Sequence, residues 1–154
     1  MIIIRSVEPH DLNALIVLCS EHAAFERADY DPTNKREKLR ELLFAREPAL
    51  IGKVAVSEGS LVGYATASAE VSTWAAARFM HMDCLFVREG HRGQRIGAKL
   101  MAAIVQEATR LGIDQLQWQT PAWNHDADRF YRRAGALASE KLRYTLVIKD
   151  SRIT

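Results

Sequence analysis

The stretch from Met82 to Leu100, MDCLFVREGHRGQRIGAKL, constrains the fold more than any other part of the chain. It begins with an apolar run that is typical of a buried strand, and a polar turn with two glycines follows at residues 88–93. From about Gln94 the apolar residues recur at helical spacing, which predicts an amphipathic helix. A strand, a glycine turn and a helix N-terminus in succession leave backbone amides that can bind an anion such as phosphate.

The glycine spacing limits which phosphate ligand this turn can hold. Gly90, Gly93 and Gly97 do not fit the dinucleotide pattern G-x-G-x-x-G, and no Gly-Lys-Ser/Thr follows, so a P-loop is excluded as well. Gly93 and Gly97 carry no Cβ, so a ligand can approach the backbone closely there. Taken alone, these residues leave an ordinary turn before a helix as the alternative.

The composition fits one soluble domain over residues 1–154. Hydrophobic residues make up 48% of the chain and charged residues 26%, which is ordinary for a globular protein with a real core. A net charge of +2, with no long basic run, argues against nucleic acid as a partner. The apolar start at residues 1–4 is too short for a signal peptide or a membrane span. Cys19 and Cys84, without a CxxC motif, indicate a reducing compartment, so we expect a cytoplasmic protein.

Patterning along the chain predicts the element order β-α-α-β-β-β-α-β-α-β. This order indicates an α/β or α+β fold with a mixed, largely antiparallel sheet flanked by helices. Glu58-Gly59-Ser60 marks a hairpin, and Asn124 is a favoured N-cap for the last helix. The helices are expected to begin near residues 12, 35, 94 and 124, and the strands to cover about 2–5, 53–57, 61–66, 78–87, 115–120 and 142–148.

Two segments carry a resemblance to a known family. The run Arg92-Gly93-Gln94-Arg95-Ile96-Gly97 resembles the coenzyme A pyrophosphate loop of the GNAT N-acetyltransferase superfamily, whose pattern is Gln or Arg, two residues, Gly, one residue, then Gly or Ala. Arg95 stands where the middle Gly is usual, and we expect it to donate its amide from ordinary helical dihedrals. Residues 124–136, NHDADRFYRRAGA, resemble the second signature of the family, and the predicted element order is that of the GNAT fold.

The resemblance implies an acetyl-CoA-dependent N-acetyltransferase. It implies that the loop amides hold the CoA pyrophosphate, that Asn124 hydrogen-bonds the pantetheine arm, and that Tyr131 protonates the leaving thiolate. On the residues alone, Asn124 is only a cap and Tyr131 a packed aromatic residue. The resemblance gives the cosubstrate-binding residues as Leu85, Phe86, Val87, Arg92, Gly93, Gln94, Arg95, Ile96, Gly97, Asn124 and Tyr131.

Within the superfamily the chain is most similar to the diamine and polyamine N-acetyltransferases. That likeness implies that Asp83 assists deprotonation of the substrate amine, since an amine with a pKa of about 10.4 is protonated at neutral pH and cannot attack. It also implies that Glu26 and Trp74 help to bind the amine, and that the protein is a homodimer. Cys84 takes the place of a second acid, which favours a small mono- or diamine, or a lysine-like amine. The shared residues are Phe25, Glu26, Trp74, Asp83 and Ala122-Trp123-Asn124.

Several alternatives remain open from the sequence. His81 is a second candidate for the base and for amine binding, and Cys84 with His81 could instead form an acetyl-cysteine intermediate. The five histidines show no ligand spacing, so no metal is expected. The competing functions are an aminoglycoside-type or peptide N-acetyltransferase, or a non-catalytic acyl-CoA-binding module.

Overall fold

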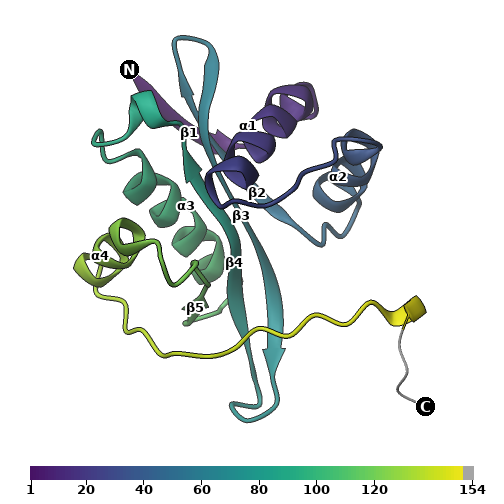
Figure 1. Cartoon of the computed structure of the whole chain (residues 1–154), viewed down its shortest axis with the longest axis vertical. Coiled ribbons are helices and arrows are strands. Elements are labelled where there is room, and N and C mark those ends of the chain that lie inside the picture. Colours follow the sequence, from purple (N-terminus) through teal and green to yellow (C-terminus); the bar gives the residue numbers. More distant parts are fainter. Residues whose placement is uncertain (151–154) are drawn as a thin grey trace. The chain divides into compact units, whose positions relative to one another are not determined.

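The sheet of the first unit contains five strands whose spatial order, β1-β2-β3-β4-β5, is their order in the chain (Figure 1). The computed structural model describes residues 1–150 and divides into two units, Met1–Pro121 and Ala122–Thr154. Strands β1 to β4 pair antiparallel and β5 joins β4 in parallel, so the sheet is mixed and largely antiparallel, as predicted. The strands are β1 (Ile2–Ser6), β2 (Ile51–Ser57), β3 (Ser60–Ser72), β4 (Ala77–Val87) and β5 (Leu116–Gln117).

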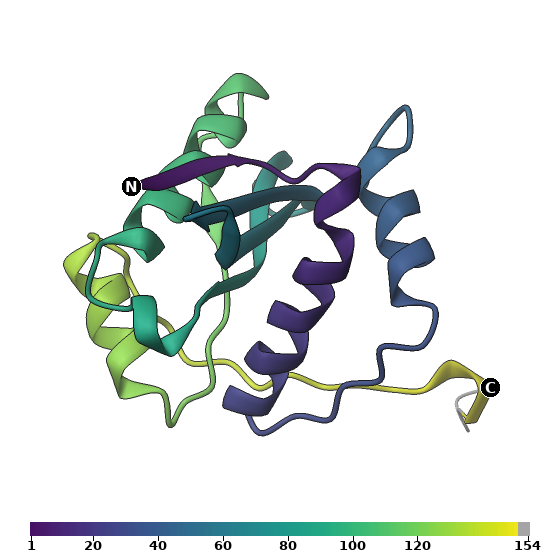
Figure 2. The same cartoon turned by 90° about the horizontal axis from the view of Figure 1, so that it is seen from above.

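Helices cover both faces of this sheet. Helices α1 (Leu12–Phe25) and α2 (Lys35–Phe44) lie on one face, and α3 (Ile96–Arg110) lies on the other (Figure 2). The first two begin at the predicted residues, whereas α3 begins after Gln94 and Arg95. None of the described helices combines the length and the apolar character that a membrane-spanning helix needs.

The core lies between the sheet and these helices. On the α1 and α2 side, the leucines of α1 pack with Leu43, Val54, Tyr64 and Phe86. On the other side, α3 buries the apolar face that its sequence spacing predicts, at Ile96, Leu100, Ile104 and Ala108. Each fully buried leucine or isoleucine contributes about 1.5–3 kcal/mol through removal of apolar surface from water.

A β-bulge interrupts the pairing of β4 with β3. Thr66 pairs with Cys84, but the next residue of β3, Ala67, pairs with Met82. Asp83 is therefore an extra residue without a partner across the ladder. An extra residue of this kind bends the strand and changes the direction of the side chains around it.

The bulge reverses the alternation of side chains along β4. Phe86 and Cys84 pack on the α1 side of the sheet. Met82 pairs with Ala67, which shares a face of β3 with Gly63, and a Cβ built on Gly63 would point at Leu100 of α3. In a regular strand, residues 82, 84 and 86 would share one face. The bulge instead lets β4 fill both halves of the core with large side chains.

The two C-terminal strands of the predicted order differ from the structure. Of the strand expected at residues 115–120, only Leu116–Gln117 pairs with a neighbour. In the second unit, α4 (His125–Arg133) is followed by residues 136–147 without regular structure, so the strand expected at 142–148 is not formed. Tyr144 and Ile148 are exposed there. The alternating pattern is typical of a strand. A strand also needs a neighbouring strand for its backbone hydrogen bonds, and none pairs with this segment among the described residues.

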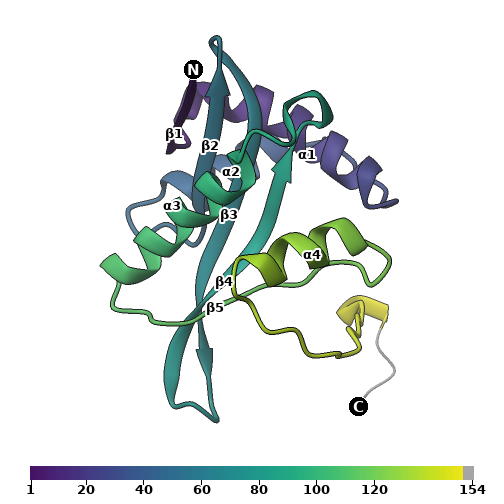
Figure 3. The same cartoon turned by 90° about the vertical axis from the view of Figure 1, so that its left-hand side faces the viewer.

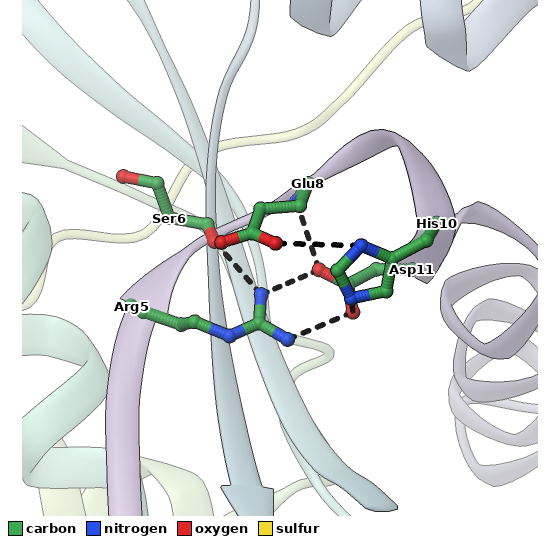
Figure 4. A network of polar contacts seen from close by, with 5 residues as sticks. All are labelled: Arg5, Ser6, Glu8, His10 and Asp11. Carbon is green, nitrogen blue, oxygen red and sulfur yellow. Dashed lines mark hydrogen bonds and ion pairs between the residues drawn. The ribbon is translucent and has the colours of Figure 1, made fainter.

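A buried ion pair fixes the start of α1 against β1 (Figure 4). The two oxygens of the Asp11 carboxylate accept hydrogen bonds from the Arg5 guanidinium at 2.6 and 2.9 Å, and one also accepts from the Glu8 N–H at 2.8 Å. Burial alone would raise the pKa of Asp11, which is only 4% exposed, but the hydrogen bonds from Arg5 and Glu8 outweigh burial, and its pKa lies below the ordinary value. The exposed imidazole of His10 lies beside the same carboxylate.

We predict that this pair makes the stability of the first unit depend on pH. A carboxylate with a lowered folded-state pKa contributes stability above its ordinary pKa, and that contribution is lost as the pH falls through the folded-state pKa. Asp11→Asn should lower the free energy of unfolding by about 1–3 kcal/mol near neutral pH, because it leaves Arg5 without its partner. Urea denaturation of both forms should show the difference shrinking as the pH falls below about 4, the ordinary pKa of an aspartate, towards the lowered folded-state pKa. Asp114→Asn, at an exposed carboxylate, is the control, and a difference that stays constant with pH would contradict the assignment.

Candidate active site

The turn between β4 and α3 presents backbone amides to solvent. Gly93 has a φ of 78°, and a Cβ at Gly93 would meet no atom within 4 Å. Arg95 is the N-cap residue of α3 but makes no side-chain capping hydrogen bond. The Lys99 amide donates to the Arg95 carbonyl at 3.1 Å, so the amides of residues 96–98 precede the first turn of intrahelical bonds. This arrangement is suited to an anion.

The expectation that Arg95 has ordinary helical dihedrals is wrong. Its φ of 61° and ψ of 16° lie in the left-handed region. That conformation costs an L-residue about 1–2 kcal/mol, whereas glycine adopts it freely. The turn places a left-handed residue directly before α3, and this explains why glycine is usual at this place in the loop that residues 92–97 resemble.

Arg92 is directed towards the end of α1. Its guanidinium carbon lies 4.5 Å from the centroid of the Phe25 ring and 5.8 Å from that of Phe86, and its Nε donates to the Val87 carbonyl at 3.0 Å. Cation–π contacts of this kind contribute about 0.5–2 kcal/mol. The predicted phosphate ligand Arg92 therefore stands beside the aromatic residues of α1 and β4, and Leu85 continues that strand opposite Ala65.

Asp83 stands at the bulge with its carboxylate accessible. The side chain is 63% exposed, Cys84 Sγ donates to Asp83 Oδ2 at 3.6 Å, and His81 Nε2 lies 3.9 Å from Asp83 Oδ1. His81 itself pairs regularly with Ser68. The bulge thus presents the carboxylate rather than the imidazole, and both candidate bases lie within one small area.

The Cys84 thiol does not suit nucleophilic catalysis. Burial, together with the nearby Asp83 carboxylate, raises the pKa of Cys84 to about 12, although hydrogen bonds with Tyr64 and Thr66 act in the opposite direction. The thiol therefore stays protonated at neutral pH, and only the thiolate is a good nucleophile. The acetyl-cysteine alternative has no physical support in this environment.

Two residues that the sequence analysis did not single out, His22 and Tyr64, form a polar contact behind this site. His22 Nδ1 lies 2.8 Å from the Tyr64 hydroxyl, and His22 Nε2 lies 3.3 Å from Glu26 Oε1. The imidazole stacks on Phe86 with ring centroids 5.0 Å apart. A signal was present in the sequence, since His22 and Glu26 are four residues apart and therefore share one face of α1.

Glu26 and Trp74, both predicted to bind the amine, lie in different places. Glu26 follows α1 directly, and its charge, like that of Asp83, reaches the His22 imidazole. Trp74 is fully exposed at the tip of the β3–β4 hairpin, which extends beyond the other strands (Figure 3). Asp83 is six residues from Ala77 along β4, or about 20 Å at about 3.3 Å per residue. Within one chain, Trp74 and Asp83 therefore do not meet at one small amine.

The second unit holds the remaining predicted residues. Asn124 caps α4, with its Oδ1 accepting a hydrogen bond from the Ala127 N–H at 3.2 Å. Tyr131 lies on the same helix, its ring at 5.3 Å from that of Phe130 in an edge-on contact. Arg132 pairs with Asp128 along the exposed face of α4. The cap and the aromatic pair are thus present as predicted.

Comparison with known proteins identifies the fold and the family. The sequence profile of the Acetyltransferase (GNAT) family matches residues 15–136. The chain belongs to the GNAT acetyltransferase family. The matched range contains the turn between β4 and α3, the bulge and α4, and the predicted family, fold and enzyme class are confirmed. Among the described residues, no group of three or more His, Cys, Asp or Glu side chains is placed to hold a metal ion.

Relatives of this GNAT acetyltransferase act on several amines. The chain is 27% identical over 149 residues to a D-amino-acid N-acetyltransferase of Saccharomyces cerevisiae, and the match covers 93% of this chain and 89% of that protein. It is 28% identical over 141 residues to a thialysine N-epsilon-acetyltransferase of Mus musculus, covering 86% and 82% of the two chains. An aminoglycoside N-acetyltransferase solved in complex with CoA has the same fold, with a TM-score of 0.80, 17% identity and coverage of 96% and 95%.

The GNAT family uses acetyl-CoA, and the residues of the turn fit its phosphates. The outward amides at the start of α3, the open space above Gly93 and the absence of a side-chain cap on this helix leave room for an anion. Gln94 is exposed in the turn, Ile96 anchors α3 in the core, and Gly97 adds no side chain to its first turn.

We predict that Arg95→Gly keeps cosubstrate binding and stabilises the fold by up to about 1 kcal/mol, because glycine adopts the left-handed conformation without strain. Thermal unfolding with and without acetyl-CoA measures both effects, since a ligand that binds only the native state raises the melting temperature. Gly97→Glu is the opposing variant and should abolish the shift by placing a negative side chain at the anion site. If Arg95→Gly abolished the shift instead, the arginine side chain rather than the amides would hold the cosubstrate.

Proposed function

We propose that this acetyltransferase transfers the acetyl group of acetyl-CoA to a cationic primary amine, either a small mono- or diamine or the side-chain amine of a lysine-like compound. The observation that carries the proposal is the accessible Asp83 carboxylate at the β4 bulge, with the charge of Glu26 nearby. Two anionic side chains are a suitable environment for an ammonium group. The named substrates of the relatives, D-amino acids and thialysine, carry amines and support this class.

The proposed chemistry is direct transfer. Asp83 binds the ammonium form and then accepts its proton, directly or through water, so that the neutral amine can attack. Bound acetyl-CoA supplies the thioester. Its carbonyl carbon forms a bond to the amine nitrogen as the bond between that carbon and sulfur breaks. The amides at the start of α3 hold the cosubstrate by its pyrophosphate, with Arg92 adding positive charge close by. We assign protonation of the leaving thiolate to Tyr131 on α4, from its place in the family signature.

An amine panel tests the substrate class. Release of CoA thiol would be followed with lysine, thialysine, a short diamine, a long polyamine, an aminoglycoside and a D-amino acid. We expect the highest kcat/KM with the lysine-like amine or the short diamine, because the two carboxylates of Asp83 and Glu26 suit a short cation better than a long polycation. A preference for the aminoglycoside would overturn the proposed class, and CoA binding without thiol release on any amine would indicate a binding module.

We predict that Asp83→Asn lowers kcat/KM for cationic amines and shifts the pH–rate profile upward. The variant keeps the shape of the side chain but removes the charge and the proton acceptor. The reaction then depends on amine that is already deprotonated, and this form becomes abundant only as the pH approaches about 10.4. Tyr131→Phe should lower kcat by about a hundredfold with acetyl-CoA binding unchanged. If the pH–rate profiles of wild type and Asp83→Asn coincide, Asp83 is not the base and His81 becomes the candidate. His81→Gln is then the matched variant.

We also propose a homodimer. The fully exposed Trp74 and the exposed apolar side chains of Tyr144 and Ile148 favour burial against another chain. Sedimentation equilibrium at micromolar concentration should give twice the mass of the chain, and Trp74→Ser should shift the equilibrium towards the monomer. A monomer for both proteins would remove this proposal, and unchanged dimerisation of Trp74→Ser would place the interface elsewhere.

A further inference from the structure

We propose that Tyr64 and His22 are positioning residues that hold Glu26 as a free, oriented carboxylate for the substrate ammonium. The inference rests on the proposed acetylation of a cationic amine and extends it to two residues behind the site. A single buried hydroxyl, that of Tyr64, fixes the imidazole of His22, and the imidazole in turn holds Glu26.

The direction of the hydrogen bonds follows from the chemistry of Tyr64. Its side chain is 2% exposed, and burial raises the pKa of its phenol far above the physiological range, so the hydroxyl keeps its proton. The thiols of Cys84 and Cys19 in the same cluster also keep their protons, because burial raises their pKa values. A protonated thiol is a donor and only a weak acceptor. The Tyr64 proton is therefore directed to the stronger acceptor, His22 Nδ1, at 2.8 Å.

This hydrogen bond selects one tautomer of His22. An imidazole whose Nδ1 accepts a hydrogen bond must carry its proton on Nε2 while it is neutral. Nε2 faces Glu26 Oε1 at 3.3 Å, so its N–H points at the carboxylate. The carboxylate is held through one oxygen, and the Glu26 side chain remains 36% exposed towards solvent. A neutral donor orients Glu26 without cancelling its charge.

The charged groups around His22 show why the neutral form must be protected. Burial lowers the pKa of His22, the Glu26 and Asp83 carboxylates raise it, and the Arg92 guanidinium lowers it. A protonated His22 would form an ion pair with Glu26 and take away the negative charge that the substrate ammonium needs. Protonation at Nδ1 would force the Tyr64 hydroxyl to turn and accept, which leaves its own proton facing thiols that are weak acceptors, so the hydroxyl adds to the cost of charging the imidazole.

The second carboxylate is held by a neighbour of Tyr64. The Cys84 thiol uses its one proton to donate to Asp83 Oδ2 at 3.6 Å. Stacking on Phe86 holds the His22 ring, with an interplanar angle of 18°. Each carboxylate of the proposed amine site thus accepts one hydrogen bond, Glu26 from His22 and Asp83 from Cys84.

Glu26, His22 and Tyr64 follow the order carboxylate, imidazole, hydroxyl, which is also the order in which an imidazole activates a hydroxyl nucleophile. The geometry here assigns a different role. A nucleophilic hydroxyl must touch its substrate. Tyr64 is enclosed by α1 and the sheet, in the core cluster that contains Leu15 and Phe86. Tyr64 and His22 therefore act on the substrate through Glu26.

The kinetic test compares Tyr64→Phe with Tyr30→Phe. The first variant keeps the ring and deletes the hydroxyl that faces His22. The second deletes a phenol that interacts with Cys19 and serves as the matched control. We expect Tyr64→Phe to raise the KM for the amine about tenfold, equivalent to about 1.4 kcal/mol, with the KM for acetyl-CoA unchanged. In this variant the KM should fall again as the pH rises and His22 loses its proton, whereas wild type and Tyr30→Phe should show no such recovery.

A double-mutant cycle separates positioning from a general loss of packing. Glu26→Gln alone should raise the KM for the amine, and adding Tyr64→Phe to it should cause no further loss, because the hydroxyl acts through Glu26. Additive effects of the two substitutions, or an unchanged KM in Tyr64→Phe with an active wild type, would overturn the inference.

A spectroscopic measurement tests the hydrogen-bond chain without any substrate. Ring ¹⁵N NMR correlations of labelled histidine distinguish the two neutral tautomers and the cation, and His22→Gln identifies the signal. We expect the Nε2–H tautomer at neutral pH in wild type, and a higher titration midpoint for His22 in Tyr64→Phe. Another tautomer in wild type, or equal midpoints, would overturn the inference even if the protein acetylates amines. If no amine in the panel is acetylated, the proposed function fails, and this measurement still decides the linkage between Tyr64, His22 and Glu26.

Discussion

The hydrogen-bonded pairing of β3 with β4 positions most of the candidate site in the first unit. This ladder sets Tyr64 opposite Phe86 and Thr66 opposite Cys84, and it leaves Asp83 unpaired at the bulge. Helix α1 then brings His22 and Glu26 to the same area through its packing on Tyr64 and Phe86. Since a ladder has few ways to accommodate one extra residue, the position of Asp83 is determined by backbone geometry before any side-chain contact is made.

Two kinds of electrostatic environment lie a few residues apart on this ladder. Asp83 is accessible to water, whereas Tyr64 and Cys84 lie in an apolar core that keeps both protonated. A group that exchanges protons with a substrate needs access, and a group that fixes the direction of a hydrogen bond needs a constant protonation state. The sheet separates these requirements, because successive side chains leave the strand in different directions.

Much of the fold could be predicted from the sequence because its helices and central strands have strong periodicity. The spacing of Ile96, Leu100 and Ile104 alone indicates which face of α3 is buried, and the structure confirms it. The bulge at Asp83 could not be predicted, because it depends on the register with β3, which no single strand contains. The left-handed Arg95 was missed for a related reason, since its conformation is imposed by the turn and not preferred by the residue.

Some residues of the candidate site could be predicted from the sequence and others could not, for the same physical reasons. Asp83 and the turn residues lie on one continuous stretch, so their proximity could be inferred from sequence. His22 and Tyr64 are distant in sequence, and neither residue type is unusual in a helix or a strand. The last predicted strand shows the opposite error: an alternating segment such as residues 142–148 has the composition of a strand, but it lacks a neighbour among the described residues.

The bulge has a consequence for how sequences can vary along β4. Residues before position 83 and residues after it obey opposite rules for which face receives a large side chain, so a substitution pattern that is tolerated at Met82 is not the one tolerated at Cys84. Deletion of Asp83 would restore a regular ladder, in which Met82 and Cys84 become direct neighbours and keep their present partners and faces. The pairing of β3 with β4 therefore does not need the extra residue: a chain can lose the bulge and keep the same sheet, but it then loses the accessible carboxylate at position 83.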